Sequence, residues 1–578
     1  MTRSVSSRLL LSLAAVAVAF AAADTYVVVL ALPDMMAGVG LAIDQLQRAA
    51  PIVSGFLLGY VAMLPLVGRI ADLRGRLPVL VASLVVFAFG SLVTAAAYDL
   101  PSMVTGRFLQ GVGGGGLVPA TLALVADLYP PSRRGVPLGV VGAVQEVGSV
   151  LGPVYGALVL ALSQWQAIFA VNLVVGLVLA AGIRATGPGE PPTGRPDVPG
   201  AVLALLTLAT LTLTMTQPTP LTSSVRVGLA FVPVAGDSRW TSPLAVAVLV
   251  CALGLLVRCL TARRPLVDVR RWAALARQAD LVGAGLLALA LAGVILAFAT
   301  ADPQVSVLPP AGPWLLLGSV VAVVLFGWHA RRAPRPLVPR AAFADRAAWG
   351  ALAVSFFVGA ALIAALVDVP LFARLTVYPD SQLDAALVLV RLMVAVPVGA
   401  LAGGYLTRRL SVGVLTAGGM LLCVAGFWWM STWGLTSLEG VAASVPLVLT
   451  GLGFGLALAP VNAALLAATD DTVHGVSTAL LVVARMVGMM VGISALTTVG
   501  LRRYYAVQVD LPSPGAVCPS GTQCTAYTRL LREAGLSQLH TVFMGAAGCA
   551  LVAGLLALVL LRVDAVARAR AGSDMLPP

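Results

Sequence analysis

Four charged residues lie deep inside long apolar stretches of this sequence, namely Asp24, Arg107, Glu146 and Arg485. A charge near the centre of a lipid bilayer costs roughly 2.5–3.5 kcal/mol or more, so each of these residues needs a partner or a function. A carboxylate beside an arginine can bind a proton, and the protonated acid no longer attracts the guanidinium. The chemistry that these residue types offer is reversible proton binding that makes and breaks buried ion pairs.

Glu146 and Arg485 are predicted to lie at the same depth in the membrane. Each is about ten residues into a helix that runs outward, which is roughly 15 Å from the inner face and close to the bilayer midplane. We therefore expect an ion pair across a cavity between the two halves of the chain, present in one conformation and released when Glu146 is protonated. A purely structural ion pair is the alternative, since removing one partner would leave a buried charge uncompensated.

Asp24 and Arg107 form a second predicted pair. Asp24 lies about 16 residues into the first helix and Arg107 about 6 residues into a helix of opposite direction, so their depths nearly coincide. Asp24 is then either a proton-carrying carboxylate influenced by Arg107 or half of a static pair that steadies the N-terminal half. Asp368 and Arg391 are their expected counterparts in the second half, with a coupling role or, for Asp368, a position facing an interface.

The composition indicates what must position these charges. Of 578 residues, 59% are hydrophobic and 10% are charged, and the mean hydropathy is +0.98. Soluble proteins carry about 25% charged residues, so a soluble multidomain enzyme is excluded. Apolar runs of roughly 20 residues predict an all-α integral membrane protein with about 16 spans. The first run, 9–32, is expected to be an uncleaved helix rather than a signal peptide, and the run 200–216 is the shortest.

Arginine placement predicts the orientation of these spans. The sequence contains no lysine, so all 36 basic residues are arginine, and the net charge is +12. With a cytoplasmic N-terminus, 25 arginines fall on the inner side, eight on the outer side and three inside helices. This bias predicts a protein of the inner (plasma) membrane with both termini in the cytoplasm. The charge is not gathered on a soluble face, which argues against nucleic acid as a partner.

Two segments of the chain look like related halves. Residues 1–183 and 348–578 each contain six predicted spans. A short, glycine-led turn that bears arginine occupies the same place in both, at Gly68–Leu80 and at Gly403–Leu415. Two six-helix halves with a path between them are a common architecture of secondary transporters.

The segment between the halves, residues 184–347, is predicted to hold four inserted spans and cytoplasmic linkers. The tetrapeptide R-P-L-V occurs at Arg264–Val267 and again at Arg335–Val338, each time after a pair of apolar runs. The repeat predicts that the insert consists of two copies of one helical hairpin.

Three motifs of the first half resemble signatures of the major facilitator superfamily. The turn after the second span matches the pattern G-x-x-x-D-x-x-G-R, the stretch from Arg107 to Gly113 resembles R-x-x-x-G-x-G, and the fifth span resembles the exporters' G-x-x-x-G-P-x-x-G. The matching residues are Gly68, Asp72, Arg74, Gly75 and Arg76 in the turn, and Gly148, Gly152, Pro153 and Gly156 in the fifth span.

The resemblance implies a role for each of these motifs. Asp72, Arg74 and Arg76 are expected to form a latch of charges and hydrogen bonds at the cytoplasmic rim, with a merely solvated loop as the alternative. The glycines of the fifth span, together with Gly142, allow close helix packing. A bend of the helix at Pro153 that acts in gating is the alternative to close packing alone.

The stretch Asp24–Pro33, D-T-Y-V-V-V-L-A-L-P, resembles the proton antiporters with fourteen spans that export drugs. Within that group the chain is most similar to actinobacterial efflux pumps implicated in multidrug and triacylglyceride export. The likeness covers both halves and one inserted hairpin, and the second hairpin is a departure. It implies a hydrophobic cargo and raises an extracytoplasmic lipoprotein as a partner.

The polar segment 503–537 is predicted to lie outside the membrane, with the last helix extending into it. Cys518 and Cys524 are expected to form a disulfide rather than remain free thiols, since oxidising compartments preserve such bonds. The segment is a docking site for a partner or lipid, or an inert closed loop. The three histidines are too scattered for a metal site, and His474 and His540 are expected at helix ends in water.

The sequence thus predicts a proton-coupled efflux transporter of hydrophobic or amphipathic compounds, drugs or lipids, that works by alternating access. It needs no cofactor, because the proton gradient supplies the energy. A phosphate-binding loop requires lysine, which argues against ATP. A non-transporting scaffold or sensor is the main alternative. A membrane enzyme is weaker, because Asp470–Asp471 is the only carboxylate pair at a membrane face.

Overall fold

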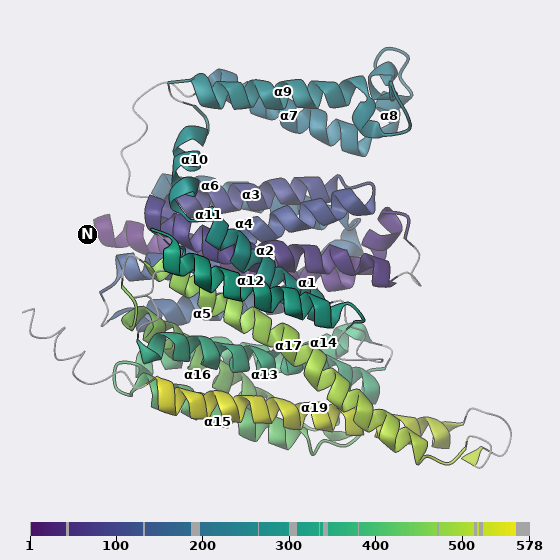
Figure 1. Ribbon diagram of the computed structural model, residues 1–578. Helices are drawn as coiled ribbons and strands as arrows, with labels where there is room; N and C mark the ends of the chain where they lie inside the picture. Colours follow the sequence, from purple (N-terminus) through teal and green to yellow (C-terminus); the bar gives the residue numbers. More distant parts are fainter. Residues whose placement is uncertain are drawn as a thin grey trace, which may run out of the picture.

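The computed structural model of the protein is helical throughout the residues that it describes (Figure 1). These are residues 2–41, 46–130, 133–186, 197–263, 265–299, 309–334, 336–338, 345–379, 381–470, 473–513, 517–518 and 524–561. A few side chains within the helices, Glu146 and Pro153 among them, also lie outside this description.

The helices are described in three groups, namely a first half, an insert and a second half. The first half contains α1 (Thr2–Gly38), α2 (Leu46–Arg74), α3 (Arg76–Ala95), α4 (Leu100–Leu128), α5 (Gly135–Leu162) and α6 (Gln166–Thr186). The insert contains α7 (Val198–Thr216), α8 (Thr219–Thr222), α9 (Pro243–Thr261), α10 (Val269–Gln278), α11 (Leu281–Ala299) and α12 (Gly312–Arg332). The second half contains α13 (Arg346–Thr376), α14 (Gln382–Leu406), α15 (Val412–Met430), α16 (Ser444–Ala467), α17 (His474–Val509) and α19 (Thr525–Leu560).

Fifteen of these helices are long and apolar enough to cross a membrane, among the described residues. The sixteenth long helix is α5, with 28 residues and several side chains outside the description. The structure therefore confirms an all-α membrane protein with about the predicted number of spans. The first run of the sequence is a full member of the bundle, because α1 packs along α5.

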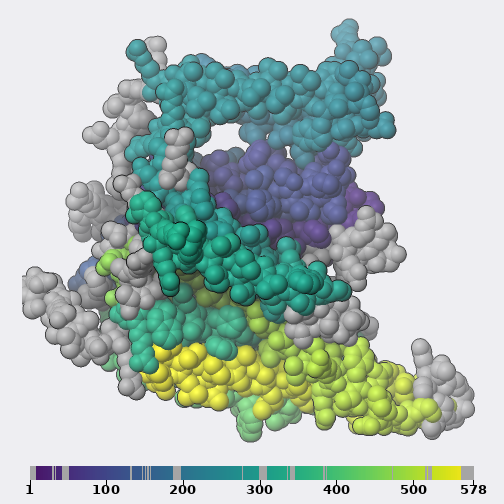
Figure 2. All heavy atoms as spheres, viewed as in Figure 1, coloured from purple at the N-terminus to yellow at the C-terminus, as the bar shows by residue number. Residues whose placement is uncertain are grey.

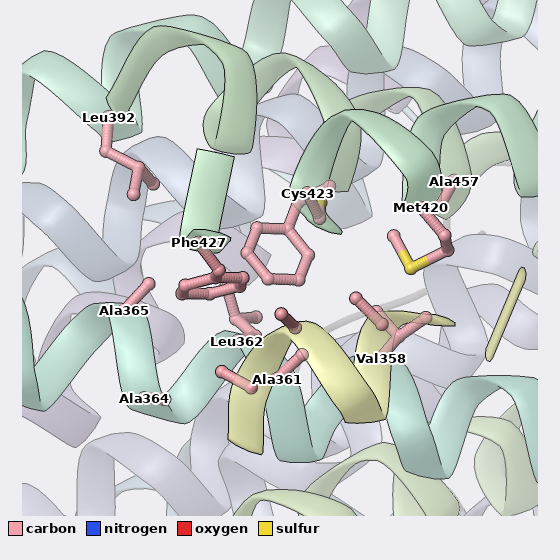
Figure 3. Close-up of a cluster of buried hydrophobic side chains, with 14 of the residues drawn as sticks. Val358, Ala361, Leu362, Ala364, Ala365, Leu392, Met420, Cys423, Phe427 and Ala457 are labelled. Atoms are coloured by element: carbon pink, nitrogen blue, oxygen red, sulfur yellow. The ribbon is translucent and has the colours of Figure 1, made fainter. Parts of the chain in front are cut away.

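The two halves repeat one packing pattern. In the first half α2 and α3 pack on α4, α1 packs on α5, and α3 packs on α6. In the second half α14 and α15 pack on α16, α13 packs on α17, and α15 packs on α19. Figure 3 shows part of the core of the second half, where Phe427 of α15 lies near Leu362 of α13 and Met420 of α15 lies on the side of Val358. The core of the second half contains residues of that half alone, whereas the core of the first half extends across the interface to Ala479 and Val482 of α17.

The halves meet at one end of the bundle. We call the end where α1 begins the inner end, because the arginine distribution predicts that it faces the cytoplasm. There α2 packs against α17, and α5 packs against α14. A side chain at Gly68 or at Gly135 would overlap the backbone of Gly475 or Gly404 across the interface. The structure is thus closed at its inner end.

The two inserted hairpins differ in their surroundings. Hairpin α11/α12 packs against α2 and α17. Hairpin α7/α9 instead touches the outer end of α3, where the Trp240 indole donates to the Tyr98 hydroxyl at 3.0 Å and Met215 packs beside Val93. In Figure 2 open space separates this hairpin from the first half over much of its length. Of the two hairpins, α11/α12 is the one that packs against the helices that join the halves, within the residues that the structure describes.

Helices α17 and α19 project beyond the rest of the bundle at its outer end (Figure 1). Each has 36 residues. Such a helix is about 54 Å long, well above the roughly 30 Å of a bilayer core. Within the polar segment 503–537 the last helix extends as predicted, since α19 begins at Thr525, and α17 also continues to Val509. Cys518 and Cys524 form the expected disulfide in the connection.

Candidate functional site

A fully buried ion pair joins α1 to α4. The Arg107 Nη1 atom lies 2.6 Å from Asp24 Oδ2, and each residue is 1% exposed. The structure thus brings together the two residues that the sequence placed at matching depth. A pair so completely removed from solvent is stable only when the remaining hydrogen-bonding groups are also satisfied.

Four neutral residues complete the surroundings of this pair. The Asn172 amide of α6 donates to Asp24 Oδ1, and the Gln110 amide donates to Ser91 Oγ at 2.9 Å. Gln110 Oε1 accepts from Arg107 at 2.9 Å and from Thr94 Oγ1 at 3.2 Å. The network spans α1, α3, α4 and α6. All of its described members belong to the first half, so separation of the halves leaves it intact.

The Arg107 guanidinium has partners besides Asp24. It lies over the ring of Phe56, 4.4 Å from the centroid, and its Nε donates to the Ile52 carbonyl oxygen at 3.4 Å. Gln110 supplies a third contact. Aromatic faces and carbonyl oxygens stabilise a cation without being charged themselves. These contacts of Arg107 come from uncharged groups and are separate from its ion pair with Asp24.

The neutral members of the network, Gln110 and Asn172 among them, were not predicted from the sequence. Gln110 lies one helical turn after Arg107, and Asn172 is an isolated amide in the apolar run 166–186. Both are the kind of polar residue that rarely enters a membrane helix without a partner. Depth matching extended to uncharged amides would have found them.

The glycines of the exporter-type motif pack α5 against α1 beside Asp24. A Cβ atom at Gly148 or Gly152 would overlap the carbonyl oxygen of Ala19 or Ala23. Close packing is therefore the observed role of these glycines, and Gly156 faces Val27 in the same way. Pro153 lies outside the described side chains, so the predicted bend at that residue stays a prediction.

Replacing Gly152 with alanine is expected to destabilise the protein by about 1–3 kcal/mol, because the new methyl group must displace the α1 backbone at the site. Thermal unfolding in detergent measures the loss. Gly142→Ala is the matched control on the same helix, since no atom lies within 4 Å of the position that its Cβ would take. Equal unfolding temperatures for the two variants would contradict the packing role.

Arg485 is buried in α17 at 8% exposure. It lines a cavity of about 20 Å³ together with Asn462 of α16 and Ser355 of α13. Such a cavity holds roughly one water molecule. The Glu146 side chain lies outside the described part of the chain, so its pairing with Arg485 stays a prediction. The matched glycine contacts of Gly148 and Gly488 place Glu146 within one residue of the equivalent of Arg485.

Asp368 and Arg391 do not repeat the pair of the first half. Asp368 is 3% exposed and has no hydrogen bond or ion pair among the described residues, whereas Arg391 donates to Ser444 Oγ at 3.4 Å. Glycine contacts show the register, because Gly492 meets Ala360 as Gly152 meets Ala23. Ala361 is therefore the equivalent of Asp24, and Asp368 lies two turns further out. The expected correspondence was wrong because depth alone does not fix helix register.

Asp72 connects the halves at the inner end. Its Oδ1 atom accepts from the Gly475 N–H at 2.8 Å, and its Oδ2 atom accepts from the Val476 N–H at 3.1 Å. N–H groups in the first turn of a helix have no acceptor within that helix, and the helix dipole there also favours a negative charge. The carboxylate of one half thus caps a helix of the other.

Of the other residues in the predicted latch, Arg76 contacts Asp72 directly. The Arg76 guanidinium lies 3.2 Å from Asp72 Oδ1 and 3.3 Å from Asp127 Oδ2. Gly75 has a φ of 95°, in the left-handed region that favours glycine, and so lets the chain turn from α2 into α3. Arg74 points away from the latch and lies over the Trp272 ring of α10, 4.5 Å from its centroid.

The described histidines lie in three separate places. His474 is 1% exposed, and its Nε2 atom is 3.1 Å from the Leu466 carbonyl oxygen. His540 lies inside α19 with Nε2 2.7 Å from the Trp433 carbonyl oxygen. His474 does begin α17, as expected, but it is buried rather than in water, and His540 lies within a helix instead of at its end. No group of three metal-ligating side chains is present in the described residues.

A sequence profile of the Major Facilitator Superfamily matches residues 14–493. The chain belongs to the major facilitator superfamily. Curated relatives from mycobacteria carry the name triacylglyceride transporter. The one from Mycolicibacterium hassiacum is 33% identical over 96% of this chain and 92% of its own length. The one from Mycobacterium tuberculosis is 34% identical over 87% of this chain and 85% of its own.

The solved structures show the same major facilitator fold. The crystal structure of a human organic anion transporter matches with a TM-score of 0.53 at 15% identity, covering 95% of this chain and 99% of its own. Family and fold together make the protein a multi-pass membrane transporter rather than an enzyme. Asp470, the described half of the suggested catalytic pair, is an exposed residue just after α16.

Proposed function

We propose that this major facilitator exports hydrophobic or amphipathic molecules, lipids such as triacylglycerides or drugs, in exchange for protons. The buried Asp24–Arg107 pair carries the proposal, because its surroundings let the carboxylate change charge while the arginine keeps neutral partners. The names of the mycobacterial relatives support a lipid cargo.

The closed inner end supports a mechanism of alternating access. In the state described here, Asp72 caps α17 and holds the halves together on that side. A proton that reaches Asp24 from outside weakens its attraction for Arg107 and loosens α1 against α4. Because α1 also packs on α5, which meets α14 of the other half, the change reaches the interface between the halves. Glu146 and Arg485 are a second proposed switch on α5 and α17.

The direction and the membrane are parts of the same proposal. The arginine bias favours the inner membrane with both termini in the cytoplasm. Export then uses the inward-directed proton gradient as its energy source and requires no cofactor. An extracytoplasmic lipoprotein that receives the cargo at the outer end stays a prediction.

Reconstituted vesicles test the proposal. A fluorescently labelled triacylglyceride and a cationic dye serve as separate probes, each followed with an imposed proton gradient and after its collapse by an uncoupler. We expect gradient-dependent movement of at least one probe, lost in Glu146→Gln. Movement that ignores the gradient would contradict proton coupling. Movement of neither probe, with protein that remains folded, would favour a non-transporting scaffold.

A further inference from the structure

The two inserted hairpins are closed at their inner ends by the same cluster of hydrogen bonds. In hairpin α7/α9 the cluster is built on Asp197, which directly precedes α7. Its carboxylate accepts from the Gly200 N–H at 3.2 Å, from the Leu266 N–H at 3.2 Å and from Arg258 Nε at 3.0 Å. Leu266 belongs to the first R-P-L-V tetrapeptide.

Hairpin α11/α12 repeats this cluster around Asp280. Its carboxylate accepts from the Gly283 N–H at 3.0 Å and from the Leu337 N–H at 2.9 Å, and it lies 2.7 Å from His329 Nε2. Leu337 belongs to the second R-P-L-V tetrapeptide, and every member occupies the same position along its hairpin. The predicted duplication therefore extends to a shared cluster. One member differs, since His329 replaces the arginine of the first copy.

Hairpin α11/α12, which carries the histidine, contacts the two helices that join the halves at the inner end. We call the inner ends of these helices, α2 and α17, the inner gate. Hairpin α11/α12 packs on α2 and α17, whose inner ends are joined through Asp72. Leu291 and Ile295 of α11 belong to a core that contains residues of α2, α4 and α17. Hairpin α7/α9 has no such contact in the described residues. A change in the Asp280 cluster therefore acts on the joint between the halves, whereas a change in the Asp197 cluster does not.

The electrostatic surroundings of the two carboxylates are simple. The Arg258 hydrogen bond holds the pKa of Asp197 below its ordinary value. Burial raises the pKa of Asp280, but the Gly283 N–H, His329 and the Leu337 N–H outweigh it and leave the pKa below its ordinary value. Both carboxylates are therefore charged near neutral pH. Arginine is also always charged, whereas histidine changes its charge between pH 5 and 8.

Several other charged groups at this end have partners away from Asp280 among the described residues. On α2, Arg69 and Arg76 act on Asp72, and Arg74 lies over Trp272 beside Arg271 and Asp268 of the α10 region. His474 of α17 contacts backbone carbonyl oxygens, and Arg332 of α12 lies over Trp328. His329 is the titratable side chain whose charge acts on Asp280 within the described residues.

We propose that Asp280 and His329 form a proton-sensitive latch that positions hairpin α11/α12 against the gate helices α2 and α17. When the imidazole binds a proton from the inner side, the ion pair with Asp280 is complete, and when it loses that proton only a neutral hydrogen bond remains. The hairpin then holds the inner gate less firmly. The consequence for transport rests on the proposed function.

Hydrogen exchange in lipid nanodiscs tests the latch without any cargo. Peptides that contain Gly283 and Leu337 are compared with those that contain Gly200 and Leu266 at pH 6 and pH 8, so that the matched hairpin corrects for the intrinsic pH dependence of exchange. We expect the relative protection of the α11/α12 peptides to fall about five-fold between the two values. His329→Arg should remove this difference, because it copies the first hairpin. A constant ratio in the wild type would overturn the latch.

Transport of the labelled triacylglyceride in vesicles then tests its effect on the gate. The inner pH is varied between 6 and 8 at a fixed gradient, and His329→Arg is expected to flatten the dependence of the rate on inner pH while retaining activity. Arg258→His is the matched control, which should give the α7/α9 peptides a pH-dependent protection and leave the transport profile unchanged. An unchanged profile in His329→Arg would refute the link to the gate. If the wild type moves no probe, the proposed function fails while the exchange result still decides the latch.

Discussion

Replacing Asp24 with asparagine is expected to abolish gradient-driven transport and to lower the stability of the first half. The asparagine can still accept a hydrogen bond from Arg107, but it cannot supply a counter-charge or carry a proton. Breaking a buried ion pair on one side costs about 3–5 kcal/mol, and the neutral partners of Arg107 place this site at the lower end. Vesicle transport and thermal unfolding measure the two effects separately.

Two controls separate a lost proton site from a damaged fold. Asp34→Asn changes an exposed carboxylate on the same helix and should behave like the wild type. The double variant Asp24→Asn with Arg107→Gln removes both buried charges, so stability should largely return while transport stays absent. If Asp24→Asn moves the probe at the wild-type rate and with the same dependence on the gradient, Asp24 does not carry the proton.

Asp72→Asn is expected to shift the protein about ten-fold towards conformations that are open at the inner end. The substitution removes the charge that caps the first turn of α17, which is worth on the order of 1–2 kcal/mol from the hydrogen bonds and the helix dipole together. A cysteine placed at Thr478, which is fully buried near the interface, reports the opening through its rate of maleimide labelling. The free cysteines 251, 259, 423 and 549 are replaced beforehand.

Asp127→Asn is the matched control for this experiment. It removes a half-exposed carboxylate that pairs with Arg76 within the first half. Because this ion pair does not cross the interface between the halves, the labelling rate should stay within about two-fold of the wild type. Equal labelling rates in Asp72→Asn and the wild type would show that the Asp72 carboxylate at the first turn of α17 does not hold the inner end closed.

Much of the fold follows from the sequence because membrane spans carry a strong signal. The length of the apolar runs predicted the membrane helices, and the similar turns that begin at Gly68 and Gly403 predicted two related halves. Depth along a helix was sufficient to pair Asp24 with Arg107, since the two helices run in opposite directions within one bundle. The position of Asp72 came from its motif, but the helix that it caps lies some 400 residues later, at Gly475.

The rest depended on helix rotation and register, which depth does not supply. Asp368 and Arg391 have suitable charges but are not paired with each other in the described residues, and Arg391 donates to Ser444 instead. The amides of Gln110 and Asn172 carry no charge and so gave no signal in a search for charges. The R-P-L-V repeat predicted the duplicated hairpin, yet the carboxylates that bind it, Asp197 and Asp280, lie about 60 residues before it.

The most direct test of proton exchange at Asp24 is a measurement of protons released when cargo binds. Purified protein in weakly buffered detergent is mixed with the labelled triacylglyceride, and a pH-sensitive dye follows the solution. We expect the wild type to release protons as the probe binds, and Asp24→Asn to bind the probe with a smaller release. Binding to the wild type without any proton release, or an equal release from both proteins, would contradict the proposal that cargo and protons exchange at this buried carboxylate.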